Sequence, residues 1–343
     1  MQFKQRSRCR GGWKEIDYFY MMQYNQFIKQ QEANACDLQK MEKTMRIVKD
    51  YMKDATLRHE LNELTEATFC FNFESWVTNG YFEGEYIPYS FEENGRILSN
   101  VSANEMHFIQ NGEKRFYIQI GTVMTASDRR NQGLARTLME QVLETYDGKC
   151  DGIYLFGNLS ALDFYRKLGF EEGAQYRYTL KEDVRLSVQK MNLEKEQGKG
   201  FVKVDPSDTR AKKAYMEAVR HSVANGAFEQ ENKYGLQMFY TSELGNVYYS
   251  KELGCFAVIA WNDKKVELQS VISTEAVSLE KVIREIPFKD QELRLGFTPR
   301  QEERDLFDHH YYNGGEEYRL FYWGSNLESI EREKLYFPVL SHA

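Results

Sequence analysis

One stretch, from Tyr117 to Phe170, constrains the fold of this chain more than any other. Phe116 to Met124 is mostly apolar, with many β-branched and aromatic residues, and predicts a buried strand. A short basic turn around Gly133 follows. The next segment carries its apolar residues on one helical stripe, namely Leu134, Leu138, Met139, Val142 and Leu143. A strand joined by a helix to a second strand, here Ile153 to Phe156, is expected to lie parallel to it.

The turn between this strand and helix has the chemistry of a phosphate site. The first N–H groups of a helix have no intrahelical partner and carry the positive end of its dipole. Gly133 has no side chain to block an anion, and Ala135 is nearly as small. Arg129, Arg130 and Arg136 surround the turn. A helix that simply begins at a glycine is the alternative interpretation.

Two motifs in this stretch resemble those of the GCN5-related N-acetyltransferases (GNAT). Arg130-Asn-Gln-Gly-Leu-Ala135 matches the Arg/Gln-x-x-Gly-x-Gly/Ala motif of that family. After the strand from Ile153 to Asn158, the segment from Leu159 to Phe170 resembles the family's second motif, a short helix that ends in Leu-Gly-Phe. The motifs occur in the right order and at the right separation, and the close resemblance covers residues 45–181.

The resemblance implies acetyl-CoA as co-substrate and assigns residues to it by position. The backbone of Val123, Met124 and Thr125 would pair with the pantetheine arm like an added strand. The backbone at Met124 could also stabilise the thioester oxyanion, and Asn158 would bond the pantetheine near its sulfur. The pyrophosphate would lie on the turn, whose expected binding residues are Arg130, Asn131, Gln132, Gly133, Leu134, Ala135 and Arg136.

Tyr165 matches the general-acid tyrosine of the family's second motif. An amine that attacks the thioester releases a thiolate, and a phenol of pKa about 10 can protonate the thiolate of a thiol of pKa about 8.5 at little cost. A core tyrosine with an amphipathic side chain is the alternative. The implied reaction is direct acetyl transfer to a primary amine, since no cysteine lies in either motif to form a covalent intermediate.

Several groups could take the proton that the amine must lose. Glu105 could act directly or through water, and His107 alternates to the same face of its strand; each could equally be an ordinary surface residue. A more distant resemblance, to tandem bacterial acetyltransferases of the enhanced-intracellular-survival type, offers the C-terminal carboxylate. The apolar tail that ends in His342 and Ala343 permits this arrangement.

The fold class expected is α/β with mixed (α+β) sheets, in two tandem domains. Residues 1–44 are expected to be a poorly packed extension or a non-native start, 45–181 the GNAT domain, and 182–200 a charged linker. Residues 201–343 repeat the order of elements and predict a degenerate GNAT-like domain with a docked tail. The segment from Thr274 to Glu280 has two acidic residues and no glycine, so it is not expected to bind a pyrophosphate. An unrelated α+β domain is the alternative.

Local signals add detail. Asp54 is expected to cap a helix that carries Leu57, Leu61 and Leu64. The aromatic run from Phe69 to Phe82 predicts a second helical stretch that ends at Asn79-Gly80 and either lines the acceptor site or packs in the core. Ser160 is expected to cap the helix of the second motif, with Asp163 in capping-box position.

Composition excludes several classes of protein. The formal net charge of −7 disfavours nucleic-acid binding, and no apolar run is long enough for a membrane span. The N-terminus lacks the features of a secretory signal. Five scattered cysteines give neither a disulfide framework nor a metal site and suit a cytoplasmic location.

The acceptor and the state of assembly are less constrained. Acidic residues would suit a cationic amine, small molecule or peptide, although solvated loop charges explain them equally well; they are Glu83, Glu85, Glu92 and Glu93. A homo-oligomer is possible. A non-catalytic acyl-CoA-binding regulatory module and a longer acyl donor are the rival interpretations.

Overall fold

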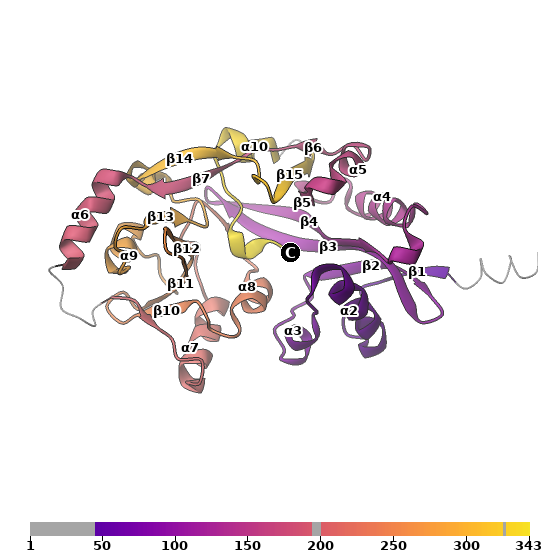
Figure 1. The fold of residues 1–343 in the computed structure, drawn as a ribbon, viewed down its shortest axis with the longest axis horizontal. Coiled ribbons are helices and arrows are strands. Elements are labelled where there is room, and N and C mark those ends of the chain that lie inside the picture. Colours follow the sequence, from indigo (N-terminus) through magenta and orange to yellow (C-terminus); the bar gives the residue numbers. More distant parts are fainter. Residues whose placement is uncertain (1–44, 194–199, 325–326) are drawn as a thin grey trace, which may run out of the picture.

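The computed structural model describes residues 45–193, 200–324 and 327–343. It is a mixed α/β protein with two mixed sheets, which confirms the expected fold class (Figure 1). The expected N-terminal extension, residues 1–44, lies outside the described residues.

The first sheet begins as an antiparallel meander. Its four strands are β1 (Met45–Lys49), β2 (Tyr86–Glu93), β3 (Arg96–Gln110) and β4 (Glu113–Thr125). From β4 the chain passes through η1 (Ser127–Arg129) into α4 (Leu134–Tyr146) and then into β5 (Gly152–Asn158). β5 pairs parallel to β4, as predicted for strands joined by a helix.

Helices cover both faces of this sheet (Figure 1). On one face α4 and the short α5 (Leu162–Arg166) pack, and α4 buries Leu134, Leu138, Met139 and Val142. On the other face lie α2 (Ala55–Phe69) and α3 (Glu74–Thr78). Asp54 caps α2 as predicted, because its Oδ1 accepts from the backbone N–H groups of Thr56 and Leu57 at 2.9 and 3.1 Å.

One local prediction is confirmed in part and another is wrong. The aromatic run contains a second helix, α3, whose C-cap is Asn79 as predicted, but it spans only five residues because Cys70 ends α2 in the left-handed conformation and α3 starts again at Glu74. The cap of the second motif is Asn158, whose Oδ1 accepts from the backbone N–H of Ser160 at 3.0 Å at the start of η2 (Leu159–Ala161). Ser160 therefore does not cap α5, which begins after Ala161 without a side-chain cap.

The second half repeats the strand–helix–strand unit. β11 (Cys255–Trp261) and β12 (Lys265–Ile272) form a hairpin, and α9 (Leu279–Glu285) joins β12 to a parallel strand, β13 (Glu292–Leu295). Further elements precede the hairpin: β8 (Val202–Lys203), α7 (Thr209–Arg220), β9 (Phe228–Gln230), α8 (Tyr234–Thr241) and β10 (Val247–Ser250). The expected linker is largely α6 (Glu182–Leu193), which packs on α9.

The two halves exchange strands. β7 (Gln175–Leu180) belongs by sequence to the first half, yet it lies in the second sheet between β13 and β14 (Phe307–Tyr312). In return, β15 (Tyr318–Trp323) lies in the first sheet beside β5, with β6 (Glu171–Glu172) on its other side. The domain division at 181 and 200 stays a prediction, and this exchange means that neither sheet is built from one continuous segment.

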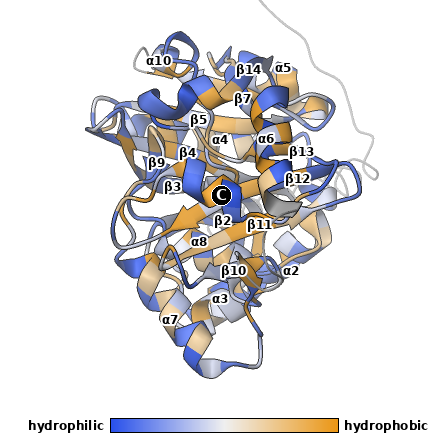
Figure 2. Ribbon diagram, turned by 90° about the vertical axis from the view of Figure 1, so that its left-hand side faces the viewer, coloured by the Kyte–Doolittle hydropathy of each residue, from blue (hydrophilic) through white to orange (hydrophobic). Residues whose placement is uncertain are grey.

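Short helical elements lie near the end of the chain. η3 (Gln301–Leu306) precedes β14, whereas α10 (Glu328–Arg332) and η5 (Val339–Ser341) follow β15. Phe337 is fully buried, and the last residue lies between the two halves (Figure 1). Hydrophobic colour concentrates in the central strands of both sheets, whereas outlying helices such as α10 are largely hydrophilic (Figure 2).

We expect Phe321→Ala to lower the free energy of unfolding by about 3–5 kcal/mol, because Phe321 is fully buried on the exchanged strand β15. Urea denaturation followed by circular dichroism measures this. Tyr311→Ala is the matched control, because Tyr311 is 61% exposed on β14. Equal effects of the two substitutions would contradict a supporting role for β15.

Candidate active site

The pairing of β4 with β5 stops half-way along both strands. The last pair is Ile120 with Leu155, yet β4 continues to Thr125 and β5 continues to Asn158. β5 keeps its backbone partners there because β15 pairs with it on the other side as far as Asn158. The β4 edge beyond Ile120 therefore faces a gap and offers backbone groups to an extended ligand, in the manner of strand addition.

A β-bulge lies on β4 at this gap. Asn100 is opposite Met124 and Ser102 is opposite Gly121, so Val101 of β3 faces two residues of β4. Thr122, one of the two, has φ +40°, which is rare for a β-branched residue.

Hydrogen bonds hold the bulge in place. The Oγ1 of Thr122 lies 2.7 Å from the hydroxyl of Tyr86, accepts from Asn100 at 3.1 Å and donates to Ser102 at 3.0 Å. Strained backbone fixed by several neighbours is common at functional sites.

The gap opens into a cavity of about 420 Å³ that contains Tyr165. The Tyr165 ring packs against Phe321, with ring centroids 5.6 Å apart, and against the backbone of Gly157. A Cβ at Gly157 would come within 3.0 Å of the ring, so the small residue allows this approach. Burial raises the pKa of Tyr165 to about 12, which keeps its phenol protonated.

The basic turn has the geometry expected of an anion site. Gly133 is the N-cap of α4 with φ +81°, and no side chain bonds the first N–H groups of the helix. Asn131 also has positive φ, at +63°. The turn is anchored by Arg130, whose Nε donates to the carbonyl of Thr125 at 3.3 Å. Arg129 instead pairs with Glu93, so its charge is partly neutralised.

Comparison with known proteins agrees with this geometry. Residues 46–170 match the model of the acetyltransferase (GNAT) family. This domain belongs to that family. The match includes both sequence motifs, and its family is one of acyltransferases.

Several solved structures are similar to this chain. A GCN5-related N-acetyltransferase from Kribbella flavida is 14% identical, with a TM-score of 0.50 over 83% of this chain and 72% of that one. Eis1 from Mycobacterium abscessus is 10% identical, with a TM-score of 0.47 over 80% and 72% of the two chains. A probable N-acyltransferase from Enterococcus faecalis is 15% identical, with a TM-score of 0.46 over 84% and 74%. None of the curated proteins matches the chain.

The expected site residues of the GNAT domain fall into two groups. Val123, Asn158 and Tyr165 line the cavity. Met124 is buried beside it; its sulfur accepts from Thr65 at 3.8 Å and its carbonyl from Ser99 at 3.0 Å. Thr125 is the last residue of β4, and the turn residues come after it; none of them is among the lining residues of the cavity.

The two side chains expected as bases lie elsewhere. Glu105 accepts a hydrogen bond from Tyr146 of α4 at 3.3 Å, and His107 stacks on Phe116 with ring centroids 4.7 Å apart. Neither lines the cavity that contains Tyr165. A direct proton transfer from an acceptor in this cavity to Glu105 is therefore not favoured by position.

The last residue of the sequence does line the cavity. The carbonyl of Ala343 accepts from the Nε2 of Gln119 at 3.1 Å and lies 2.7 Å from where a Cβ of Gly121 would be. The ring of His342 stacks on Phe156 at 3.8 Å, and the hydroxyl of Tyr240 donates to its carbonyl. Sequence reasoning anticipated the tail but missed Gln119 and α8, which show no motif.

The equivalent turn of the second half is already occupied. The backbone N–H of Leu279, at the start of α9, donates to the carboxylate of Glu303 at 2.6 Å. A carboxylate thus sits at this helix N-terminus, where the GNAT domain leaves α4 without a side-chain cap. This arrangement agrees with the expectation that the second half has lost cofactor binding.

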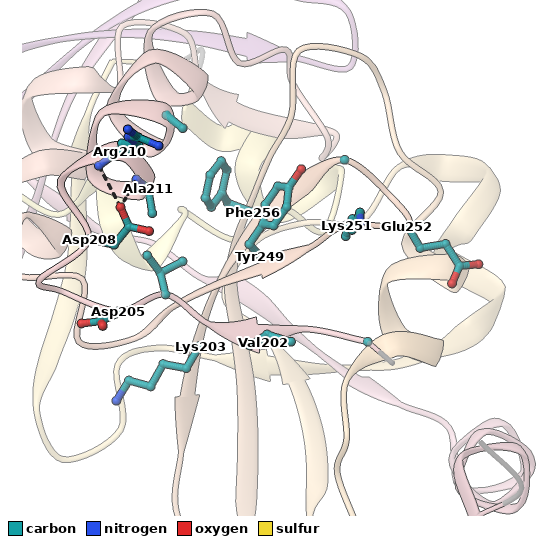
Figure 3. A pocket seen from close by; sticks show the side chains of 14 residues that line it. Val202, Lys203, Asp205, Asp208, Arg210, Ala211, Tyr249, Lys251, Glu252 and Phe256 are labelled. Atoms are coloured by element: carbon teal, nitrogen blue, oxygen red, sulfur yellow. Dashed lines mark hydrogen bonds between the residues drawn. The ribbon is translucent and has the colours of Figure 1, made fainter. Parts of the chain in front are cut away.

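A larger hollow of about 1070 Å³ lies on the second half, between β8, α7 and β10 (Figure 3). Its lining mixes charged residues of both signs. Asp208 there already caps α7, because its Oδ1 accepts from the backbone N–H of Arg210 at 2.9 Å. The smaller cavity is the candidate active site because its lining includes both the β4–β5 gap and Tyr165.

Neither a metal-binding cluster nor a membrane-spanning helix occurs among the described residues. No group of three or more His, Cys, Asp or Glu side chains there could hold a metal ion. Within the same ranges, no helix is both long and apolar enough to cross a membrane.

We expect Glu74→Gln to destabilise the cavity wall by about 1 kcal/mol at neutral pH. Glu74 of α3 binds the buried Arg58 of α2 through two hydrogen bonds of 2.9 and 3.0 Å, and the half-exposed position of Glu74 limits the effect. Urea denaturation measures it, with Glu63→Gln on the exposed face of α2 as control.

The same pair predicts a pH dependence. The hydrogen bonds from Arg58 hold the pKa of Glu74 below its usual value. The stabilisation is therefore complete above the pKa of the unfolded chain and is lost as pH falls through the folded pKa. The difference in stability between wild type and Glu74→Gln should shrink on acidification, and a difference that grows would contradict the assignment.

Proposed function

We propose that this protein transfers an acetyl group from acetyl-CoA to a primary amine by direct attack. The observation that carries the proposal is the end of β4–β5 pairing at Ile120 and Leu155, beside Tyr165. The α4 N-terminus, which has no side-chain cap among the described residues, follows β4 after η1 and the basic turn. The extended arm of acetyl-CoA fits the strand edge, its anionic end fits the helix N-terminus, and its thioester would lie beside the phenol.

Each part of the cofactor has a proposed partner. The pantetheine arm would pair with the β4 backbone at Val123, Met124 and Thr125, and Asn158 would contact it from β5. The pyrophosphate would bind at the turn, to Arg130, Asn131, Gln132, Gly133, Leu134, Ala135 and Arg136. The oxyanion would form near the bulge, where the backbone at Met124 lies.

Tyr165 is the proposed general acid. Its phenol lies in a cavity wall, so it can approach the sulfur of a thioester bound in the gap. Burial raises the pKa of Tyr165 to about 12, so the phenol keeps its proton and can donate a hydrogen bond to the sulfur as negative charge develops there. Complete transfer of that proton to a free thiolate, whose thiol has a pKa of about 8.5, would be uphill.

The base stays open among Glu105, His107, water and a C-terminal carboxylate. Ala343 lines the cavity where an acceptor amine would enter. Because neither Glu105 nor His107 lines the cavity, each would accept the amine's proton through a water molecule. Kinetics of Glu105→Gln, compared with a variant that carries one added glycine after Ala343, distinguishes these routes.

We expect Gly133→Asp to weaken acetyl-CoA binding at least about tenfold, because a carboxylate would stand where the pyrophosphate binds. Asp tolerates positive φ and caps helices well, so the fold should persist. Gly133→Asn is the neutral control of the same shape. Calorimetric titration with acetyl-CoA and with free CoA gives the dissociation constants.

Equal affinities of Gly133→Asp and Gly133→Asn would contradict a phosphate site at this turn. A complete lack of binding by the wild-type protein would contradict the proposed function itself.

We expect Tyr165→Phe to lower kcat by about 10²- to 10⁴-fold and to leave the affinity for acetyl-CoA nearly unchanged. The loss removes the proton donor and keeps the ring that packs on Gly157 and Phe321. Thiol release during acetylation of an amine measures kcat. Full activity of the variant would exclude the acid role, and binding without turnover in the wild type would favour the rival, a non-catalytic acyl-CoA-binding module.

The pH profile gives an independent check. Since burial raises the pKa of Tyr165 from its usual value near 10 to about 12, the phenol stays protonated at pH 10. We therefore expect no loss of kcat between pH 8 and 10 from deprotonation of Tyr165. An alkaline limb near pH 9 that disappears in Tyr165→Phe would contradict this.

A further inference from the structure

The cavity has two chemically different ends. At one end lie the polar groups of Gln119 from β4, Asn158 from β5 and Tyr165 from α5, together with Ala343. At the other end, the lining is apolar, mostly aromatic, and comes from both halves of the chain. Its members are the aromatic residues Phe69, Phe71, Phe73, Trp76 and Phe239, with Leu236.

The aromatic end is a packed cluster. Phe239 of α8 contacts Phe71, Phe73 and Trp76 from the α2–α3 region, with ring centroids 5.7, 6.1 and 5.6 Å apart. Trp76 also ties the two parts together, because its indole N–H donates to the carbonyl of Gly235 at 2.8 Å. The wall is thus fixed from two sides and presents several ring surfaces to one space.

The polar atoms of these walls already have partners. The indole N–H of Trp76 is bonded to Gly235, the hydroxyl of Tyr86 to Thr122, and the hydroxyl of Tyr240 to the carbonyl of His342. What remains for a ligand at this end is ring surface. A ligand group that fits must be apolar, because a polar group would lose water without gaining hydrogen bonds.

The acidic residues that seemed suited to a cationic acceptor are not available to it. Glu83 pairs with Arg220, Glu92 with Arg46 and Glu93 with Arg129. The Oε2 of Glu85 accepts from the backbone N–H of Glu83 at 3.1 Å; its Oε1 is buried without a hydrogen-bond partner, but Glu85 does not line the cavity. Among the described residues that line the cavity, none is an Asp or a Glu. A polyamine would therefore find no side-chain carboxylate for its additional charges.

We propose that the acceptor is a primary amine on a short link to a flat apolar ring, an arylalkylamine. The ring would occupy the aromatic end and the amine would reach the thioester at the β4–β5 end. A protonated amine that passes ring faces also gains cation–π attraction before it loses its proton. This inference rests on the proposed function and specifies the acceptor of the same site.

The test compares kcat/KM for 2-phenylethylamine, n-propylamine and spermidine, by thiol release from acetyl-CoA with the full chain. Burial of one phenyl ring is worth about 1.5–3 kcal/mol, so 2-phenylethylamine should exceed n-propylamine by about 10- to 100-fold. Spermidine should resemble n-propylamine. A preference for spermidine, or equal values for all three amines, would overturn the inference.

Variants of Phe239 localise the effect. Phe239→Ala should remove most of the preference for 2-phenylethylamine over n-propylamine, whereas Phe239→Leu should keep part of it because an apolar surface remains. The dissociation constant of acetyl-CoA is measured for each variant and should match the wild type, which shows that the domain is folded. An unchanged preference in Phe239→Ala would overturn the assignment of the ring to this end.

Calorimetry separates failure of this inference from failure of the proposed function. Acetyl-CoA binding without acetylation of any of the three amines, and without 2-phenylethylamine binding to the CoA complex, would overturn the acceptor class and leave the cofactor site standing. Absence of acetyl-CoA binding would overturn both.

Discussion

The structure depends on where the backbone pairing of two parallel strands ends. A strand inside a sheet can leave its neighbour only if its own backbone groups keep partners. β5 does so because β15 pairs with it along its length, past the last β4–β5 pair at Leu155. The exchange of β7 and β15 between the halves thus supports the gap in which we place the cofactor. It also explains why the site needs the second half of the chain.

The C-terminal segment contacts both halves of the chain. In the second sheet, the point equivalent to the gap lies after the pair of Leu268 with Leu295. There the N–H of Val339 donates to the carbonyl of Gly296 at 2.9 Å, and its side chain takes the space that a Cβ of Gly296 would need. Four residues later, Ala343 enters the cavity of the GNAT domain. One segment therefore fills the gap of the second half and completes the first.

In the proposed function, catalysis and recognition use different parts of the lining of one cavity. The polar end includes residues of β4 and β5, the two strands that lead into the two GNAT motifs. The aromatic end joins the α2–α3 region to α8 of the second half, through contacts such as Trp76 with Phe239. This division explains how a domain with common motifs can serve a particular acceptor: α8 and the tail can change without altering the strand edge or the turn that would hold the cofactor.

The sequence by itself determined the local chemistry: the buried strand, the turn at Gly133, the helix after it, the Asp54 cap and the position of Tyr165 in its motif. These depend on residues close together in the chain, whose periodicity and φ preferences are local. The strand exchange, the bulge at Thr122, the wall from Phe239 and the place of Ala343 were decided by the tertiary structure. Each depends on contacts between residues far apart in sequence, and no local pattern carries that information.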